Sequence, residues 1–257
     1  MGSDGTYVAA HSPPAPVTER PFLTAAWRDL AMLNYAVAPD MLAPLVPAGT
    51  VLDTWQGTAY VSVVGFRFLG TRLLGVPVPL HRDFEEVNLR FYVRRPMPDG
   101  DRRGVVFVRE IVPRRAIAAV ARLAYNEPYV AWPMRHAVDA AGAGASVRYG
   151  WRRDGAWEGF VLRTDGAPAL LVPGSEAEFI TEHYWGYTRQ RDGSTVEYRV
   201  THPPWNVAPA AEASLDADVA ALYGPAFADA LAGPPASAFL ADGSPITVYR
   251  PSRLPRG

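Results

Sequence analysis

Hydrophobic and polar residues alternate along the stretch 85–95, EEVNLRFYVRR, which is the pattern of a β-strand with two different faces. Its apolar face carries Val87, Leu89, Phe91 and Val93, and its polar face carries Glu86, Asn88, Arg90 and Tyr92. Two runs rich in valine and aromatic residues, 58–69 and 104–112, predict neighbouring strands. The loop 70–84 between the first two strands is rich in glycine and proline and contains His81.

The second half of the chain repeats this hairpin character. Asp154-Gly155 is a tight-turn signal between two amphipathic runs within 147–163, and Asp192-Gly193 leads into a predicted strand over 195–202. A last short strand is expected over 246–249.

Helical signals are fewer. Residues 27–45 predict a strand followed by a short helix, and 113–125 favour a helix beginning at Pro113. Ser175 and Glu178 form a capping box that opens a predicted helix over 175–190. On that helix Phe179, His183 and Tyr187 would share one face. Residues 214–231 predict another helix, broken at Gly224-Pro225.

Short antiparallel strands with a few inserted helices indicate an α+β fold built on an antiparallel sheet or barrel. The similar character of the two halves favours one continuous domain over residues 21–257. Residues 1–20 are rich in Gly, Ser and Pro without periodicity, which predicts a disordered N-terminal arm.

Composition excludes several classes of function. A net charge of −1 gives no basic surface for nucleic acid or an anionic membrane, and no apolar run approaches the about 18 residues of a membrane span. The chain has no cysteine, which excludes disulfides and thiolate chemistry. Together with the lack of a signal peptide, this predicts a cytoplasmic protein.

Lysine is absent as well, so all 25 basic side chains are arginines. A guanidinium stays protonated at any working pH and cannot become an amine nucleophile. The α-amino group of Met1 is the one primary amine in this sequence. The sequence therefore excludes catalysis through a lysine Schiff base.

Two features are candidates for chemistry, and each has two interpretations. The polar face of 85–95 either faces solvent, which is the commoner arrangement, or lines a polar cavity, which its Asn and Tyr favour. Glu110 lies in an otherwise apolar run, so it is either an acid or base with a raised pKa or the partner of Arg90, Arg114 or Arg115 in an ion pair. The histidines show no metal-ligand spacing, and no phosphate loop is present, so we expect neither a metal nor a cofactor.

Five stretches carry a resemblance to a known family: FLTAAWRDLAMLNYAV (22–37), AYVSVVGFRFLGTRLLGVPVP (59–79), FEEVNLRFYV (84–93), FITEHYWGYT (179–188) and YRVTHPPW (198–205). In order and spacing they resemble the YqjF-like family of uncharacterised bacterial proteins (domain of unknown function 2071). That family is grouped with the acetoacetate decarboxylase superfamily. The resemblance implies a closed β-cone or β-barrel with a polar central cavity and a few peripheral helices.

The decarboxylase uses a Schiff-base lysine beside a second lysine in an Arg-Glu-x-x-x-Pro-Lys-Lys type segment, and this enzyme is the standard example of a lysine amine activated by a neighbouring cation. Here the similar stretch is Arg109-Glu110-Ile111-Val112-Pro113-Arg114-Arg115, one residue shorter. The resemblance thus implies a cavity that keeps the acids Glu86 and Glu110 and replaces the lysines with Arg114 and Arg115 as an anion clamp.

We therefore expect a small-molecule enzyme of lyase, isomerase or hydratase type, acting on an oxygenated organic acid or carbonyl compound. Glu110, Glu86 and Tyr92 are the expected catalytic residues; the expected substrate-binding residues are Arg90, Arg114, Arg115, Asn88, His81, His183 and Tyr187. The alternatives are a ligand-binding or sensing protein that uses the same cavity, and a vestigial pocket held by ion pairs. The expected partner is a small molecule, and a homo-oligomer is compatible with the sequence.

Overall fold

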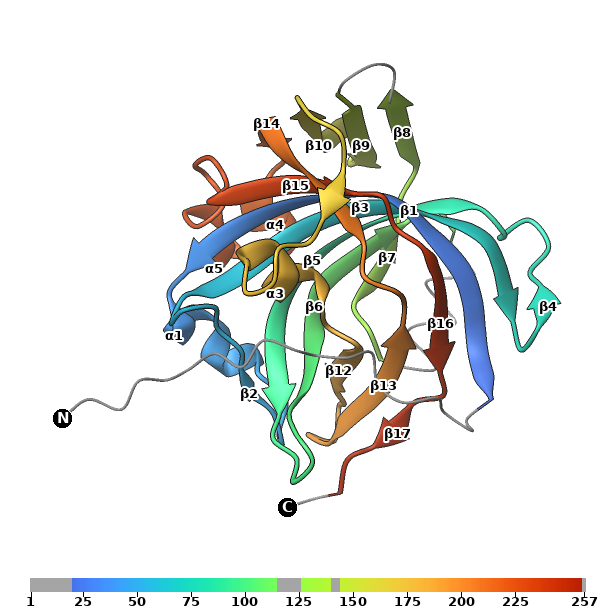
Figure 1. The fold of residues 1–257 in the computed structure, drawn as a ribbon, viewed down its shortest axis with the longest axis vertical. Helices are drawn as coiled ribbons and strands as arrows, with labels where there is room; N and C mark the ends of the chain where they lie inside the picture. Colours follow the sequence, from blue (N-terminus) through green and yellow to red (C-terminus); the bar gives the residue numbers. More distant parts are fainter. Residues whose placement is uncertain (1–19, 115–125, 140–143, 256–257) are drawn as a thin grey trace.

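The computed structural model describes residues 20–114, 126–139 and 144–255, and its centre is a ring of paired strands (Figure 1). The ring consists of β1 (Pro21–Val37), β3 (Ala59–Leu73), β5 (Phe84–Arg95), β6 (Arg102–Val112), β12 (Trp185–Arg189), β13 (Thr195–Thr201) and β16 (Pro245–Tyr249). Each strand pairs with the next in this order, and β16 pairs again with β1. All these pairings are antiparallel except that of β6 with β12. The predicted, mainly antiparallel α+β architecture is confirmed.

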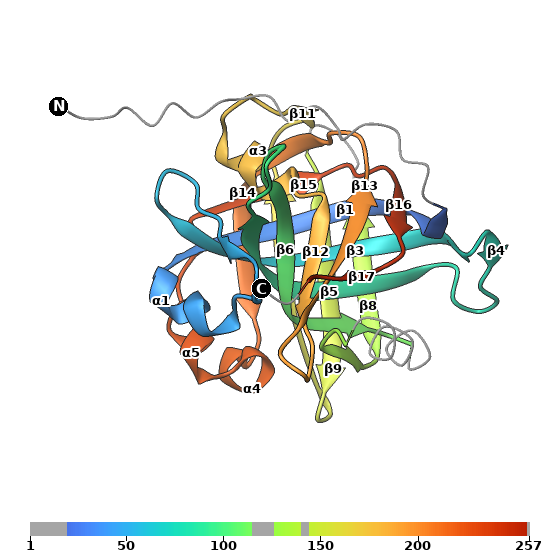
Figure 2. The ribbon, with the colours of Figure 1, turned by 90° about the horizontal axis from the view of Figure 1, so that it is seen from below.

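A second layer packs on the outside of the ring (Figure 2). It contains the strands β8 (Met134–Asp139), β9 (Ser146–Arg153) and β10 (Ala156–Thr164), joined to the ring through β14 (Asn206–Asp216) and β15 (Ser237–Ala241). The remaining elements are the strands β2 (Val51–Leu52), β4 (Val76–Pro77), β7 (Tyr129–Ala131), β11 (Ala169–Leu170) and β17 (Ser252–Arg253), the helices α1 (Pro39–Leu42), α3 (Glu176–Thr181), α4 (Val219–Tyr223) and α5 (Pro225–Ala228), and the 3₁₀ helix η1 (Ala43–Leu45).

Both faces of β5 are buried, which decides between the two interpretations of its alternation. The apolar face, for example Leu89 and Phe91, belongs to the core between the ring and the second layer. The polar face points into the ring, where Glu86 is 3% exposed and Asn88 is 2% exposed. The solvent-facing interpretation of this face is therefore wrong, because the closed ring places it against an interior cavity.

The helix predicted over 175–190 is wrong beyond residue 181. Ser175 does cap α3, since its hydroxyl oxygen accepts from the backbone N–H of Glu178 at 3.2 Å, and the Glu178 carboxylate accepts from the N–H of Gly174 at 2.7 Å. After Thr181 the chain becomes the strand β12, because the edges of β6 and β13 offer it backbone partners. His183 and Tyr187 accordingly do not share a helical face with Phe179.

Two other helix predictions have different outcomes. The stretch 214–231 is helical only from Val219, because 214–216 continues β14 and pairs with β10; the expected break at Gly224-Pro225 separates α4 from α5. The helix favoured over 113–125 lies almost wholly outside the described residues, as does the disordered arm expected over 1–20. Among the described residues, no helix has both the length and the apolar character needed to cross a membrane.

Gly65 on β3 lies where the ring meets the second layer, and a side chain there would collide with two rings. A Cβ added at Gly65 would lie 2.6 Å from both Phe160 and Tyr149. We expect Gly65→Ala to lower the free energy of unfolding by about 2 kcal/mol through overpacking, measured by denaturant unfolding. Gly166→Ala, which meets no atom within 4 Å, is the matched control. Equal stability of the two variants would contradict this account of the close approach.

Candidate functional site

The ring encloses a cavity of about 310 Å³ to which every ring strand contributes a side chain. Its polar lining residues are Thr71, His81, Glu86, Asn88, Arg90, Glu110, Glu127, Tyr129, Thr181, His183, Tyr198 and His202. Most of the other lining residues are aromatic or aliphatic. A mainly apolar concave pocket with convergent polar groups is the usual form of a small-molecule site.

Strand register places three of the polar residues in one row. Asn88 on β5 lies opposite Glu110 on β6, and Glu110 lies beside Tyr129 on the parallel strand β7. Side chains at paired positions of neighbouring strands project from the same face of a sheet. Residues separated by about twenty positions in the sequence therefore meet on one wall of the cavity.

Three carboxyl groups and two phenols form a cluster on this wall. The Glu86 carboxylate accepts hydrogen bonds from the Asn88 amide and the Tyr129 hydroxyl, each at 3.0 Å. The Glu127 carboxylate accepts from the Tyr198 hydroxyl at 2.6 Å. The Tyr129 hydroxyl also bonds to Glu110, so it joins two of the acids.

Gly186 on β12 makes room for one of these phenols. A Cβ added at Gly186 would lie 2.2 Å from the Tyr198 ring, on the strand that pairs with it. The absence of a side chain lets the ring lie over β12 and direct its hydroxyl to Glu127.

Burial raises the pKa of all three acids in the cluster, and repulsion between carboxylates adds to this at Glu110 and Glu127. Desolvation raises the pKa of Glu86 to about 7, partly opposed by its hydrogen bonds and by Arg90. Desolvation and the charge of Glu86 raise the pKa of Glu127 to about 8. The pKa of Glu110 is raised well above its ordinary value by desolvation, then by Glu127 and Glu86. At neutral pH Glu127 and Glu110 are thus mainly protonated, and a protonated carboxyl group can donate a hydrogen bond to a ligand.

Several buried polar atoms around the cavity have no hydrogen-bond partner among the described residues. They are Trp27 Nε1, Thr71 Oγ1, Asn88 Oδ1, Glu110 Oε2 and His183 Nδ1, and all five residues line the cavity. Leaving such an atom unsatisfied costs about 1–3 kcal/mol, so native proteins retain them where another molecule completes the bond. Their concentration here favours a polar ligand over a vestigial pocket.

Arg90 is a buried cation whose hydrogen-bonding contacts among the described residues are all neutral. It donates to the Ile180 carbonyl at 3.3 Å and to the Tyr92 hydroxyl at 3.4 Å, and it approaches the Met32 sulfur at 3.8 Å. No carboxylate among the described residues forms an ion pair with it. A buried guanidinium without a direct ion-pair partner is unfavourable, and an anionic ligand group would supply that partner.

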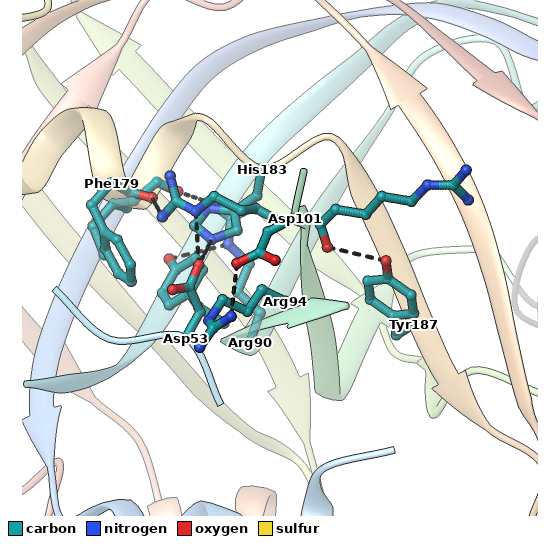
Figure 3. A network of polar contacts seen from close by, with 11 residues as sticks. Asp53, Arg90, Arg94, Asp101, Phe179, His183 and Tyr187 are labelled. Atoms are coloured by element: carbon teal, nitrogen blue, oxygen red, sulfur yellow. Dashed lines mark hydrogen bonds and ion pairs between the residues drawn. The ribbon is translucent and has the colours of Figure 1, made fainter. Parts of the chain in front are cut away.

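His183 lies two residues after the end of α3, and its ring contacts the side chain of an acid, Asp53 (Figure 3). Its Nε2 lies 3.4 Å from the Asp53 carboxylate, which also accepts from Arg103 at 2.7 Å. Desolvation and the charge of Arg103 lower the pKa of His183 to about 3, so the ring is neutral. Because Nε2 faces Asp53, the neutral tautomer leaves Nδ1 as an acceptor.

The structure brings six of the expected site residues to the cavity: Glu86, Asn88, Arg90, Glu110, His81 and His183. Tyr92 is buried beside it and does not line it; its hydroxyl contacts Ser62 at 2.6 Å and supports Arg90. Tyr187 belongs to the outer core and donates to the Arg102 carbonyl at 3.1 Å (Figure 3).

The expected arginine clamp is not found at Arg114. That residue is exposed and does not line the cavity, because the chain leaves the sheet after Val112. Arg115 lies outside the described residues. The ion-pair interpretation of Glu110 with Arg90 or Arg114 is wrong as well, since neither contact is present among the described residues.

Sequence reasoning missed Glu127, Tyr129 and Tyr198. The first two flank Pro128 in a short segment whose one signal was an acid and a phenol next to an apolar run. Tyr198 lies within a predicted strand, where no local pattern singled it out. Among the described residues, no group of three His, Asp or Glu side chains is arranged to hold a metal ion.

Comparison with known proteins identifies related sequences. The model of DUF2071, a family of uncharacterised conserved proteins, matches residues 24–245. The uncharacterised protein YqjF of Bacillus subtilis (strain 168) is 28% identical over 183 residues, which cover 70% of this chain and 72% of the relative. The YqjF-like assignment is confirmed.

Solved structures share the fold at low sequence identity. Acetoacetate decarboxylase from Legionella pneumophila aligns with a TM-score of 0.63 and 14% identity, covering 98% of this chain and 93% of that chain. An acetoacetate decarboxylase-like enzyme from Sphingomonas wittichii RW1 aligns with a TM-score of 0.60 and 16% identity, covering 91% of this chain and 92% of that chain. The enduracididine biosynthesis enzyme MppR complexed with pyruvate aligns with a TM-score of 0.62 and 12% identity, covering 94% of this chain and 93% of that chain. The predicted acetoacetate decarboxylase type of fold is confirmed.

The buried acids make stability depend on pH. In the folded chain the pKa values of Glu86 and Glu127 are about 7 and about 8, above the ordinary 4.5, so between these values the folded chain binds more protons than the unfolded chain. The stabilisation that comes from this extra proton binding is fully present below pH 4.5 and is lost as pH rises through about 8. We expect denaturant unfolding to show lower stability at about pH 9 than at about pH 6.

Glu127→Gln, which mimics the protonated acid, should flatten this dependence. The exposed Glu212, whose side chain is 73% accessible, provides the control variant Glu212→Gln. A wild-type slope retained in Glu127→Gln would show that Glu127 is ionised in the folded chain at neutral pH.

Proposed function

The chain belongs to the DUF2071 family of uncharacterised conserved proteins, and we propose that it is a small-molecule enzyme that moves protons on a carbonyl compound or oxygenated organic acid. The reaction would be of lyase, isomerase or hydratase type. The observation that carries the proposal is Glu110, a fully enclosed acid with a raised pKa and an oxygen that has no partner within the described protein.

The cluster supports a balanced proton transfer. Protonated Glu110 gives its proton to the carbonyl oxygen of the substrate, and ionised Glu86 takes a proton from the adjacent carbon. The C–H electron pair becomes the carbon–carbon double bond of an enol, and the carbonyl π pair becomes the new O–H bond. Burial raises the pKa of both acids: at about 7, that of Glu86 leaves an ionised form available as a base, and that of Glu110, well above its ordinary value, favours the protonated form that an acid needs.

The other polar residues would orient the substrate. Arg90 would hold its anionic group, since this cation has only neutral contacts within the described protein. Asn88 donates to Glu86 and keeps an unsatisfied carbonyl oxygen, and His183 offers a second acceptor. Tyr92 would position Arg90 and would not touch the substrate.

A ligand-binding or sensing protein is the second candidate. It is favoured by the same unsatisfied atoms, which recognise a ligand whether or not it reacts. Binding without proton exchange distinguishes it from an enzyme.

Glu110→Gln tests the acid–base role directly. In deuterated buffer we expect the wild-type protein to catalyse exchange of the methyl protons of pyruvate, a simple 2-oxo acid, and NMR follows the loss of the proton signal. Removal of the general acid should slow the exchange by at least about 100-fold.

The control is Glu212→Gln, which changes an exposed acid of the same type. Gln is isosteric with the protonated Glu, so thermal unfolding should show that the fold is retained. Unchanged exchange in Glu110→Gln would refute the assignment, and pyruvate binding without exchange in the wild type would favour the binding protein.

Trapping with borohydride tests the absence of imine chemistry. After incubation with acetone and sodium borohydride, peptide mapping by mass spectrometry should find no adduct on residues 102–131, because this segment contains no amine side chain. The α-amino group of Met1 is the one position where labelling is expected. An adduct within 102–131 would contradict the proposed mechanism.

A further inference from the structure

One wall of the cavity is aromatic, and it begins directly beside the carboxyl cluster. Phe68 and Phe84 are stacked at 4.6 Å between ring centroids, and Trp27 meets Phe66 and Phe68 edge-on at 5.3 and 5.9 Å. Trp205 lies edge-on to Trp27 at 6.2 Å. All five residues line the cavity, and we refer to them as the aromatic wall.

Strand register sets the position of the aromatic wall relative to the acids. Phe84 and Phe68 are paired residues, and the next inward-facing pair along the same strands is Glu86 with Phe66. On β5 the inward-facing residues run from Phe84 through Glu86 and Asn88 to Arg90, a span of about 20 Å at about 3.3 Å per residue. The cavity therefore has a cationic end, an acidic middle and an aromatic end.

The aromatic end continues into an apolar rim. Leu23, Leu73 and Val78 line the cavity there, and they are only partly buried. The adjoining β3–β4 hairpin and the loop after it expose Val76 (65%) and Leu80 (86%). An apolar path of this kind makes no favourable contacts with a small hydrophilic substrate. It removes an apolar group from water along its whole length, which favours binding.

We propose, resting on the function proposed above, that the substrate is a 2-oxo or 3-oxo acid with an aromatic substituent. Its carboxylate pairs with Arg90, its carbonyl lies at Glu110 and Glu86, and its ring packs against the aromatic wall. The volume agrees, because a cavity of about 150 Å³ accommodates benzene and this one is about 310 Å³. Aromatic rings gain additional energy from edge-to-face and offset contacts of the kind that the wall offers.

Isothermal titration of the full chain with pyruvate and with phenylpyruvate tests the proposal. The two probes share the 2-oxo acid and differ by the ring. We expect phenylpyruvate to bind at least about 30-fold more tightly, from the apolar area that its ring buries. Equal or weaker binding of phenylpyruvate, or no binding of either probe up to about 10 mM, would overturn the proposal.

Variants of the wall locate the binding energy. Phe68→Leu keeps an apolar side chain of similar size, and we expect it to lower phenylpyruvate affinity by about 5-fold while leaving pyruvate affinity unchanged. Phe160→Leu is the matched control, since Phe160 is also buried but belongs to the outer core. A loss of phenylpyruvate affinity that is the same in both variants would refute the assignment of the ring to this wall.

The outcome also separates this proposal from the proposed function. If phenylpyruvate binds as expected but no exchange depends on Glu110, the substrate class stands and the enzymatic function fails. If pyruvate is exchanged through Glu110 while phenylpyruvate does not bind, the enzymatic function stands and the aromatic substrate class fails.

Discussion

Closure of the strand ring is the constraint on which the rest of the structure depends. When β16 pairs with β1 and β12 with β6, most of the polar side chains on the inner face of the sheet are removed from bulk water. Glu86, Glu110 and Glu127 are then desolvated together, and desolvation is the largest cause of the raised pKa of each. An open sheet of the same strands would leave these acids hydrated and ionised. The proton-donating character of the cavity is thus a consequence of topology as much as of residue type.

The local part of this fold could be predicted from sequence. Alternation located β5, and turn residues located the hairpin at Asp154, because both signals lie within a few neighbouring residues. Closure could not be predicted from pattern alone, since the parallel pairing of Trp185 with Gly104 joins segments about eighty residues apart. The same pairing explains the failed helix beyond Thr181, where strand partners outweighed a helical spacing of aromatic residues.

The site residues also fall into those that local sequence patterns predicted and those that only the tertiary structure brought together. Glu86, Asn88 and Arg90 share a strand face, so alternation alone grouped them, and Glu110 stood out as an acid among apolar residues. Tyr129 was missed because only the parallel register of β7 beside β6 brings it next to Glu110. The expectation for Arg114 rested on a linear alignment of motifs. The chain turns out of the sheet at that point, so sequence neighbours of a buried acid need not accompany it into the cavity.

The structure shows which residue lies beside Glu110 in this chain without lysine. The resemblance placed a cation after Pro113 beside Glu110. The cavity residue beside Glu110 is instead Tyr129, which follows Pro128. Desolvation and the neighbouring carboxylates raise the pKa of its phenol well above the ordinary value, so it remains a neutral hydrogen-bond donor and not a nucleophile. With no lysine amine to form a covalent intermediate, the groups that line the cavity can stabilise charge and exchange protons. Proton transfer between oxygen and carbon is the chemistry that such a set of groups can perform without a covalent bond to the chain.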